Sequence, residues 1–153
     1  MTIEQTLMGL SSLAKKLNYH HIRWALGASL LLYLEGYNIT VEDIDIIVHK
    51  DDTNLLLDML KNYEYTCQEP NDQYRTKHFY SLFSEGVDVD IMIGFKVVKE
   101  DSIYEFPFHI EKELNVNNSK VYCSSVAEWL KAYKAMNRID KVLLLQANKK
   151  RTE

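Results

Sequence analysis

The segment Trp24-Ala-Leu-Gly-Ala-Ser-Leu30 is followed closely by Thr40-Val-Glu-Asp-Ile-Asp-Ile-Ile-Val48, and these two segments indicate the fold most clearly. The first part predicts a short buried strand that stops at Gly27 and an apolar helix over residues 28–35. The second part alternates acidic and apolar residues before it runs apolar, which is typical of a strand over residues 43–49. A strand, a tight turn, a helix and a second strand are therefore expected in close succession.

Two aspartates at the start of the second strand are candidate functional residues. Because strand side chains alternate between faces, we expect Asp43 and Asp45 to point the same way and Glu42 to face oppositely. Two carboxylates at ~4 Å repel each other by ~4 kcal/mol at an effective dielectric of ~20. A raised pKa, an Arg or Lys partner, or a divalent cation must offset this repulsion.

The turn Gly27-Ala28-Ser29 is a candidate phosphate site. Gly27 allows another backbone segment to approach closely, and Ser29 falls in the first turn of the helix, where free N–H groups favour an anion. Mg²⁺ is commonly held by one or two carboxylates together with substrate phosphates. A phosphate on this turn, with its metal on the two aspartates, would form a Mg²⁺–nucleotide site.

A further strand, Val87-Asp-Val-Asp-Ile-Met-Ile93, offers a third carboxylate. Asp88 and Asp90 share one face of this strand, and one of them completes a three-acid cluster if the strand pairs beside residues 43–49. Two-metal sites use such clusters. Asp90 is favoured because more apolar residues flank it, and Asp88 stays open as a metal ligand.

The remaining elements place these motifs in a mixed sheet. We expect a first helix over residues 3–17, a helix over 52–62, strands over 63–68, 76–83 and 87–95, a less distinct strand pair over 104–110 and 120–123, and helices over 126–136 and 139–148. This order predicts an α+β fold with a mixed β-sheet flanked by helices, not a doubly wound parallel sheet. The length of 153 residues predicts a single domain, residues 1–153.

Composition excludes several classes of protein. With 46% apolar and 26% charged residues, no apolar run near ~18 residues and no signal-like N-terminus, the chain is expected to be cytoplasmic and without a membrane segment. Cys67 and Cys123 are expected to be reduced, packed thiols. The net charge of −4 argues against strong binding of duplex nucleic acid.

Charge is distributed unevenly along the chain. From Glu128 onward there are seven Lys or Arg and three acidic residues, a local balance of +4, whereas the preceding 127 residues carry −8. This basic segment is either a solvated helix face or a source of phosphate ligands.

The small-residue turn, the Asp-Ile-Asp strand and the later acidic strand resemble the DNA polymerase β-like nucleotidyltransferase superfamily, and most nearly the lincosamide nucleotidyltransferase and AbiEii-toxin type of domain. The family's turn residues fall on Gly27 and Ser29, and its Asp-x-Asp on Asp43 and Asp45. Its third acid falls on Asp90 or Asp88. The resemblance implies a nucleotidyltransferase fold, Mg²⁺ or Mn²⁺ as cofactor and a nucleoside triphosphate (NTP) as substrate.

The segment from Ser125 to Lys141 resembles the helix of these relatives that carries a Lys, then an Arg and an Asp, near the triphosphate. The resemblance therefore implies nucleotide binding by Lys134 and Arg138. One departure is that residues 38–39 are Asn-Ile where relatives often have an Arg. No second domain for an acceptor is apparent, so its site is expected from the last helices, a partner protein or the second copy of a homodimer.

The leading interpretation is Mg²⁺-dependent transfer of a nucleoside monophosphate (NMP) from an NTP to a hydroxyl of a small molecule, a protein or an RNA end. Asp43, Asp45 and Asp90 are the expected catalytic and metal-binding residues. Gly27, Ala28, Ser29 and Lys134 would hold the phosphates. The alternative, favoured by the missing Arg and the small size, is a non-catalytic nucleotidyltransferase-fold binding or toxin–antitoxin regulatory module.

Overall fold

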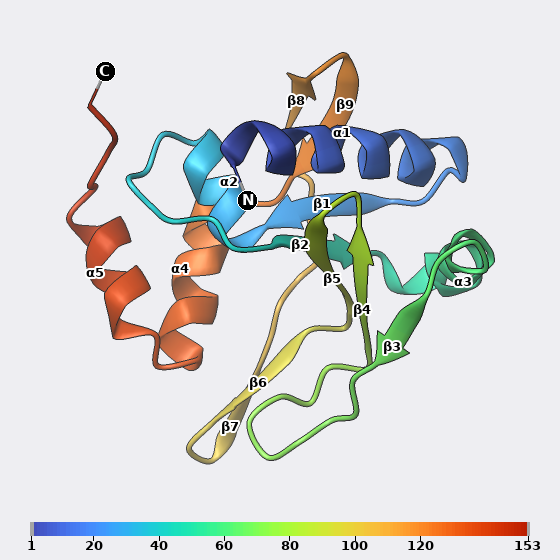
Figure 1. Ribbon diagram of the computed structural model, residues 1–153. Helices are drawn as coiled ribbons and strands as arrows, with labels where there is room; N and C mark the ends of the chain where they lie inside the picture. The colour runs from blue at the N-terminus through green and yellow to red at the C-terminus, as the bar shows by residue number, and fades with distance from the viewer. Residues whose placement is uncertain (1, 153) are drawn as a thin grey trace.

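A seven-stranded mixed sheet forms the centre of the computed structural model, which describes residues 2–152 (Figure 1). Its strand order is β3-β4-β5-β2-β1-β9-β8, and a separate β6–β7 hairpin lies beside it. The strands are β1 (Trp24–Gly27), β2 (Ile44–Val48), β3 (Tyr65–Cys67), β4 (His78–Ser84), β5 (Val87–Ile93), β6 (Lys96–Lys99), β7 (Ser102–Glu105), β8 (Lys112–Val116) and β9 (Ser119–Cys123). The α+β class with a mixed sheet is therefore confirmed.

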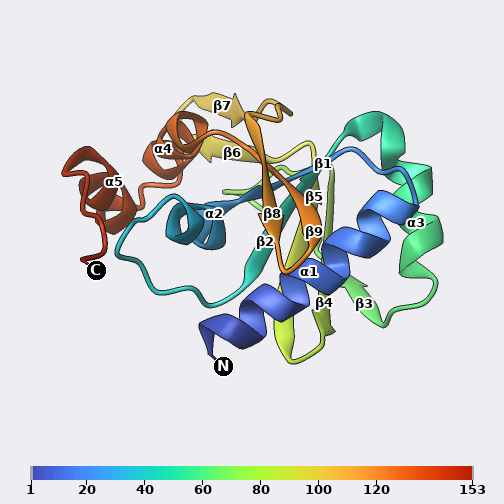
Figure 2. The ribbon, with the colours of Figure 1, turned by 90° about the horizontal axis from the view of Figure 1, so that it is seen from above.

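The helices gather in two groups around this sheet. They are α1 (Ile3–Tyr19), α2 (Ala28–Leu34), a 3-10 turn η1 (Lys50–Asp52), α3 (Thr53–Leu60), α4 (Val126–Ala135) and α5 (Ile139–Gln146). Figures 1 and 2 show α2, α4 and α5 together at one end of the molecule, with α3 at the other end and α1 lying along the sheet. In the part of the chain that the structure describes, no helix combines the length and apolar character that crossing a membrane requires.

The register of the central strands aligns the candidate residues. β2 runs antiparallel to β1, with Gly27 opposite Asp45, and parallel to β5, with Asp45 opposite Asp90. On the other side of β5, Ser81 of the antiparallel strand β4 lies opposite Asp90. The condition for a three-acid cluster, that the second acidic strand pairs beside the Asp-Ile-Asp strand, is met, and one row across the sheet holds Gly27, Asp45, Asp90 and Ser81.

Apolar residues of the same strands form the core. Ile44 and Ile46 of β2 are fully buried, as are Trp24 and Leu26 of β1 and Ile91 of β5. Full burial of each Leu or Ile side chain contributes about 1.5–3 kcal/mol. The alternation predicted for β2 therefore holds: its apolar side chains lie in the core while Asp45 is only partly covered.

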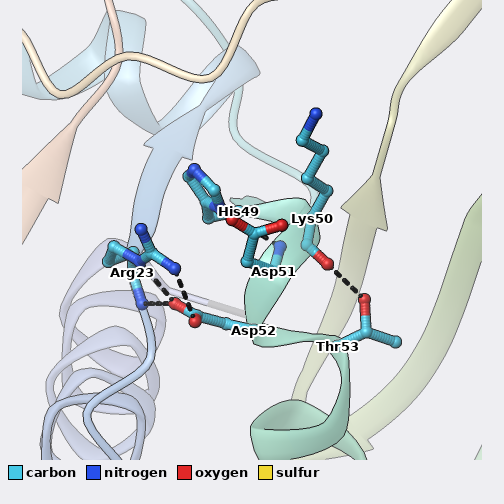
Figure 3. A network of polar contacts seen from close by, with 6 residues as sticks. All are labelled: Arg23, His49, Lys50, Asp51, Asp52 and Thr53. Carbon is cyan, nitrogen blue, oxygen red and sulfur yellow. Dashed lines mark hydrogen bonds and ion pairs between the residues drawn. The ribbon is translucent and has the colours of Figure 1, made fainter.

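An ion pair joins the start of β1 to the start of α3 (Figure 3). Asp52 accepts hydrogen bonds from the backbone N–H of Arg23 (2.8 Å), its Nε (2.9 Å) and its terminal guanidinium nitrogen (2.9 Å). Asp52 is the N-cap of α3 but makes no side-chain capping bond, because both of its oxygens are bound to Arg23. The guanidinium holds the pKa of the Asp52 carboxyl below its usual range.

The predicted pairing of residues 104–110 with residues 120–123 is wrong. β7 pairs with β6 in the separate hairpin, and β9 pairs with β8 and β1. The strand β8, Lys-Glu-Leu-Asn-Val, is mostly exposed and polar, so it has no apolar alternation by which to be recognised. Both cysteines are free, but Cys67 is exposed on the edge strand β3 and only Cys123 is packed.

Candidate active site

A single tight turn connects β1 to α2. Gly27 ends β1 in extended backbone and is the N-cap of α2, and Ala28 follows with a φ of +53°. This left-handed conformation costs an L-residue about 1–2 kcal/mol. Strain of this kind persists where surrounding structure fixes the backbone, and it concentrates at functional sites.

Gly27 makes room for an aromatic ring, not for another backbone segment as expected from the sequence. A Cβ on Gly27 would lie 2.2 Å from Cζ2 of Trp129. The Trp129 indole N–H donates to the Ser124 hydroxyl (2.8 Å), which donates in turn to the Leu26 carbonyl (2.6 Å). These contacts fix helix α4 against the end of β1.

Three carboxylates converge beside this turn. Asp43, Asp45 and Asp90 are half-buried, and each offers an oxygen within 4.8 Å of the others. Burial, followed by the charges of Asp43 and Asp90, raises the pKa of Asp45 well above its usual range. Burial also raises the pKa of Asp90, although the Ser81 hydroxyl, which donates to its Oδ1 (2.8 Å), acts in the opposite direction.

The donor set suits a divalent cation. Among residues 2–152, the ion pairs include none that neutralises Asp43, Asp45 or Asp90. Without a cation, the repulsion is relieved only by protonation, as the raised pKa values of Asp45 and Asp90 indicate. Clustered carboxylate oxygens are the ligands that Mg²⁺ and Mn²⁺ prefer. The residues therefore fit a divalent metal.

The carboxylates form one wall of a cleft of about 500 Å³. Around it lie the β1–α2 turn, the loop before β2, and the inner faces of α4 and α5. The lining residues are Ala28, Ser29, Thr40, Glu42, Asp43, Asp45, Tyr74, Phe79, Asp90, Met92, Phe95, Trp129, Tyr133, Met136, Arg138, Asp140 and Lys141.

The structure brings together most, but not all, of the candidate residues. Ala28, Ser29 and Arg138 line the cleft with the three carboxylates, and Gly27 lies beneath it under the Trp129 ring. Asp88 is exposed and lies outside the three-carboxylate group. Lys134 lines a different cavity with Lys131, so its helix turns it away from the cleft.

Several residues of the cleft were not among the candidates from the sequence, and they include the polar residues Glu42, Tyr133 and Lys141. β2 begins only at Ile44, so strand alternation does not apply to Glu42, which faces the cleft and not the opposite side. Tyr133 follows Trp129 by one helical turn, a spacing that could have indicated its shared face. No local pattern marked Lys141.

A second cavity of about 290 Å³ adjoins the cleft at Asp90. Tyr74, Phe79 and Asp90 line both cavities, and the other walls come from the segment between β3 and β4 and from β4 itself. The additional lining residues are Gln68, Glu69, Pro70, Asn71, Thr76 and Ser81.

Comparison with known proteins gives one family and several similar structures. The sequence model of the aminoglycoside-2''-adenylyltransferase family matches residues 9–144. A search of curated proteins finds no match to this chain.

Three solved structures share the fold. A proposed nucleotidyltransferase from Thermotoga maritima has a TM-score of 0.72 at 20% identity, over 96% of this chain and 94% of that one. ANT(2'')-Ia in complex with adenylyl-2''-tobramycin has a TM-score of 0.55 at 11% identity, over 94% and 87%. The lincosamide antibiotic adenylyltransferase LnuA, bound to lincomycin, has a TM-score of 0.53 at 19% identity, over 85% of each chain.

Proposed function

We propose that this chain, which belongs to the aminoglycoside-2''-adenylyltransferase family and is a nucleotidyltransferase, uses a divalent metal to move an NMP from an NTP to a hydroxyl of a small molecule. The observation that carries the proposal is the convergence of three carboxylates opposite the β1–α2 turn. The cleft of about 500 Å³ lies within the usual range for ligand sites.

The nucleotide's phosphates would lie between the carboxylates and the cationic end of the cleft. The Ser29 hydroxyl and the free N–H groups of the turn can donate to phosphate oxygens. Arg138 and Lys141 line the same cleft and supply positive charge. Lys134, which points elsewhere, is replaced in this role by Lys141.

Asp43, Asp45 and Asp90 would hold Mg²⁺ or Mn²⁺ through their clustered oxygens. When bound, the metal supplies positive charge that offsets the carboxylate repulsion and the charge on the phosphates. Asp90 has a second role in this proposal, because it borders both cavities and can accept the proton of an acceptor hydroxyl.

Nucleotidyl transfer forms one bond at the α-phosphorus, breaks another, and moves one proton. The acceptor oxygen forms a bond to the α-phosphorus, the bond from that phosphorus to the bridging oxygen of the β-phosphate breaks, and pyrophosphate leaves with the electron pair of that bond. The hydroxyl proton passes to Asp90. Ser81 holds Oδ1 of Asp90, which leaves Oδ2 available for the acceptor.

The acceptor would be a small molecule bound by this chain itself. ANT(2'')-Ia and LnuA carry an adenylylated aminoglycoside and a lincosamide antibiotic in their structures. Here the second cavity offers a place for such a molecule at Asp90, without a dimer partner. Free thiols and a substrate NTP suit the cytoplasm.

Release of pyrophosphate tests this function. The wild-type chain would be incubated with each of the four NTPs, with Mg²⁺ or Mn²⁺, and with tobramycin or lincomycin as acceptor. We expect metal-dependent pyrophosphate release, its loss in Asp45→Asn, and its retention in Asp101→Asn, a matched change in the exposed β6–β7 turn. NTP binding without release would favour the non-catalytic module, and no binding at all would contradict both.

A further inference from the structure

The phenol of Tyr133 is a deeply buried polar side chain that lines the cleft. The residue is 3% exposed, and its ring packs against Trp129 with centroids 5.8 Å apart. Trp129 is itself held by Gly27 and Ser124. The position of the Tyr133 ring relative to the β1–α2 turn is therefore fixed by packing on α4.

The hydroxyl of Tyr133 has no hydrogen-bond partner among the described residues. Every fully buried side-chain oxygen or nitrogen of these residues has a partner, so the Tyr133 hydroxyl is not fully buried and reaches open space. The space that Tyr133 lines is the cleft. A phenol that is buried elsewhere usually has a partner for its O–H. The structure thus supplies a rigid donor without an acceptor.

Charged side chains of the cleft act on the Tyr133 hydroxyl. Burial, then the negative charge of Asp45 and, more weakly, of Asp43 raise the pKa of Tyr133, and the positive charge of Arg138 opposes them. Tyr133 lines the cleft together with Asp43 and Asp45 and with Arg138 and its ion-pair partner Asp140. It is protonated at neutral pH, so it can donate a hydrogen bond.

We propose that the Tyr133 hydroxyl donates a hydrogen bond to the triphosphate of the bound nucleotide, where the phosphates pass from the carboxylate cluster towards Arg138. The proposal rests on the proposed function, because it takes the nucleotide's place in the cleft from there. The contact is to phosphate, not to the base, so it is independent of which NTP binds. Tyr133 thus fills the place on α4 that the sequence assigned to its neighbour Lys134.

The test is binding of α,β-methylene analogues of the four NTPs, and of inorganic tripolyphosphate, each with Mg²⁺, to Tyr133→Phe. This change removes only the hydroxyl and keeps the ring on Trp129. We expect the Kd for the analogues and for tripolyphosphate to rise roughly 10- to 100-fold, the effect of losing a hydrogen bond to a charged group. The melting temperature of the metal-free, nucleotide-free protein should not fall, because the hydroxyl has no protein partner to lose.

Tyr104→Phe is the matched control. The Tyr104 hydroxyl bonds to Glu128 and lines a different cavity, so its loss should lower the melting temperature and leave nucleotide binding unchanged. Wild-type affinity in Tyr133→Phe for both the analogues and tripolyphosphate would overturn the proposal, and so would an affinity loss confined to the nucleotides. If the wild-type chain binds no triphosphate, the proposed function fails together with this inference, whereas normal binding by Tyr133→Phe overturns the inference alone.

Discussion

The Trp129 indole of helix α4 occupies the space that a side chain on Gly27 would need, with 2.2 Å between Cζ2 and an added Cβ. This contact joins two segments that are distant in the sequence, and it sets the rotation of α4 about its axis. Tyr133 and Trp129 consequently face the cleft, while Lys134 faces away. The absence of a side chain at Gly27 thus allows the seating of α4 in which Tyr133 lines the cleft.

Gly27→Ala tests this contact. We expect the free energy of unfolding to fall by about 1–3 kcal/mol, because an added methyl group must displace a packed ring. In a Trp129→Phe background the same substitution should lower the free energy of unfolding by less, because the smaller phenyl ring lacks the indole atom Cζ2. Urea denaturation of the two single variants and the double variant measures the coupling. An equal decrease in the free energy of unfolding in both backgrounds would show that the Trp129 ring does not restrict the side chain at residue 27.

Asp52→Asn tests the ion pair at the start of α3. At neutral pH we expect the free energy of unfolding to fall by about 1–2 kcal/mol, because Asp52 is buried and accepts three hydrogen bonds from Arg23. The decrease is no larger because the Arg23 side chain is half-exposed, so solvent weakens the ion pair. The pKa of Asp52 is lowered in the folded state, so the stabilisation is complete above the unfolded-state pKa near 4 and disappears as pH falls through the folded-state value. Unfolding curves of both proteins from pH 7 to pH 2 should therefore converge at the acid end. A constant difference over this range would refute the assignment.

Asp90→Asn and Asp88→Asn decide which acid of β5 serves the reaction. Because Asp90 is the proposed proton acceptor and metal ligand, its loss should lower kcat for nucleotidyl transfer by about 100-fold or more. Asp88 is exposed and lies outside the carboxylate group, so its variant should retain nearly all activity. Steady-state kinetics with a fixed acceptor provide the measurement. If Asp88→Asn lowered kcat and Asp90→Asn did not, Asp88 would be the third acid, and β5 would have to be arranged differently.

The carboxylate cluster was largely predictable because its determinants are local. Strand alternation places Asp45 on the face opposite Ile44 and Ile46, and the acidic, apolar pattern of β5 repeats it. The pairing of β5 with β2 is a long-range contact that local sequence patterns do not predict. The three-acid cluster could therefore be predicted only on the condition that these two strands pair. The structure meets that condition with Asp45 opposite Asp90.

The cationic and aromatic parts of the cleft were less predictable, since they depend on how helices pack. Successive residues of a helix point about 100° apart, so only the seating of Trp129 decides that Tyr133, and not Lys134, faces the carboxylates. Similarly, Glu42 faces the cleft because β2 begins only at Ile44, so strand alternation does not extend to residue 42. Such rotations and end points are set by tertiary contacts, which a single sequence does not display.

The thermal stability of Asp45→Asn is the sharpest test of whether Asp43, Asp45 and Asp90 bind a divalent cation. Without metal, burial and then the repulsion from Asp43 and Asp90 raise the pKa of Asp45, so the carboxylate destabilises the fold increasingly as pH rises from the unfolded-state pKa through the folded-state value. At pH 7 in chelator, Asp45→Asn should therefore melt at a higher temperature than the wild type. Added Mg²⁺ or Mn²⁺ should raise the melting temperature of the wild type and leave that of the variant unchanged. Equal shifts of both proteins on adding metal would contradict the account.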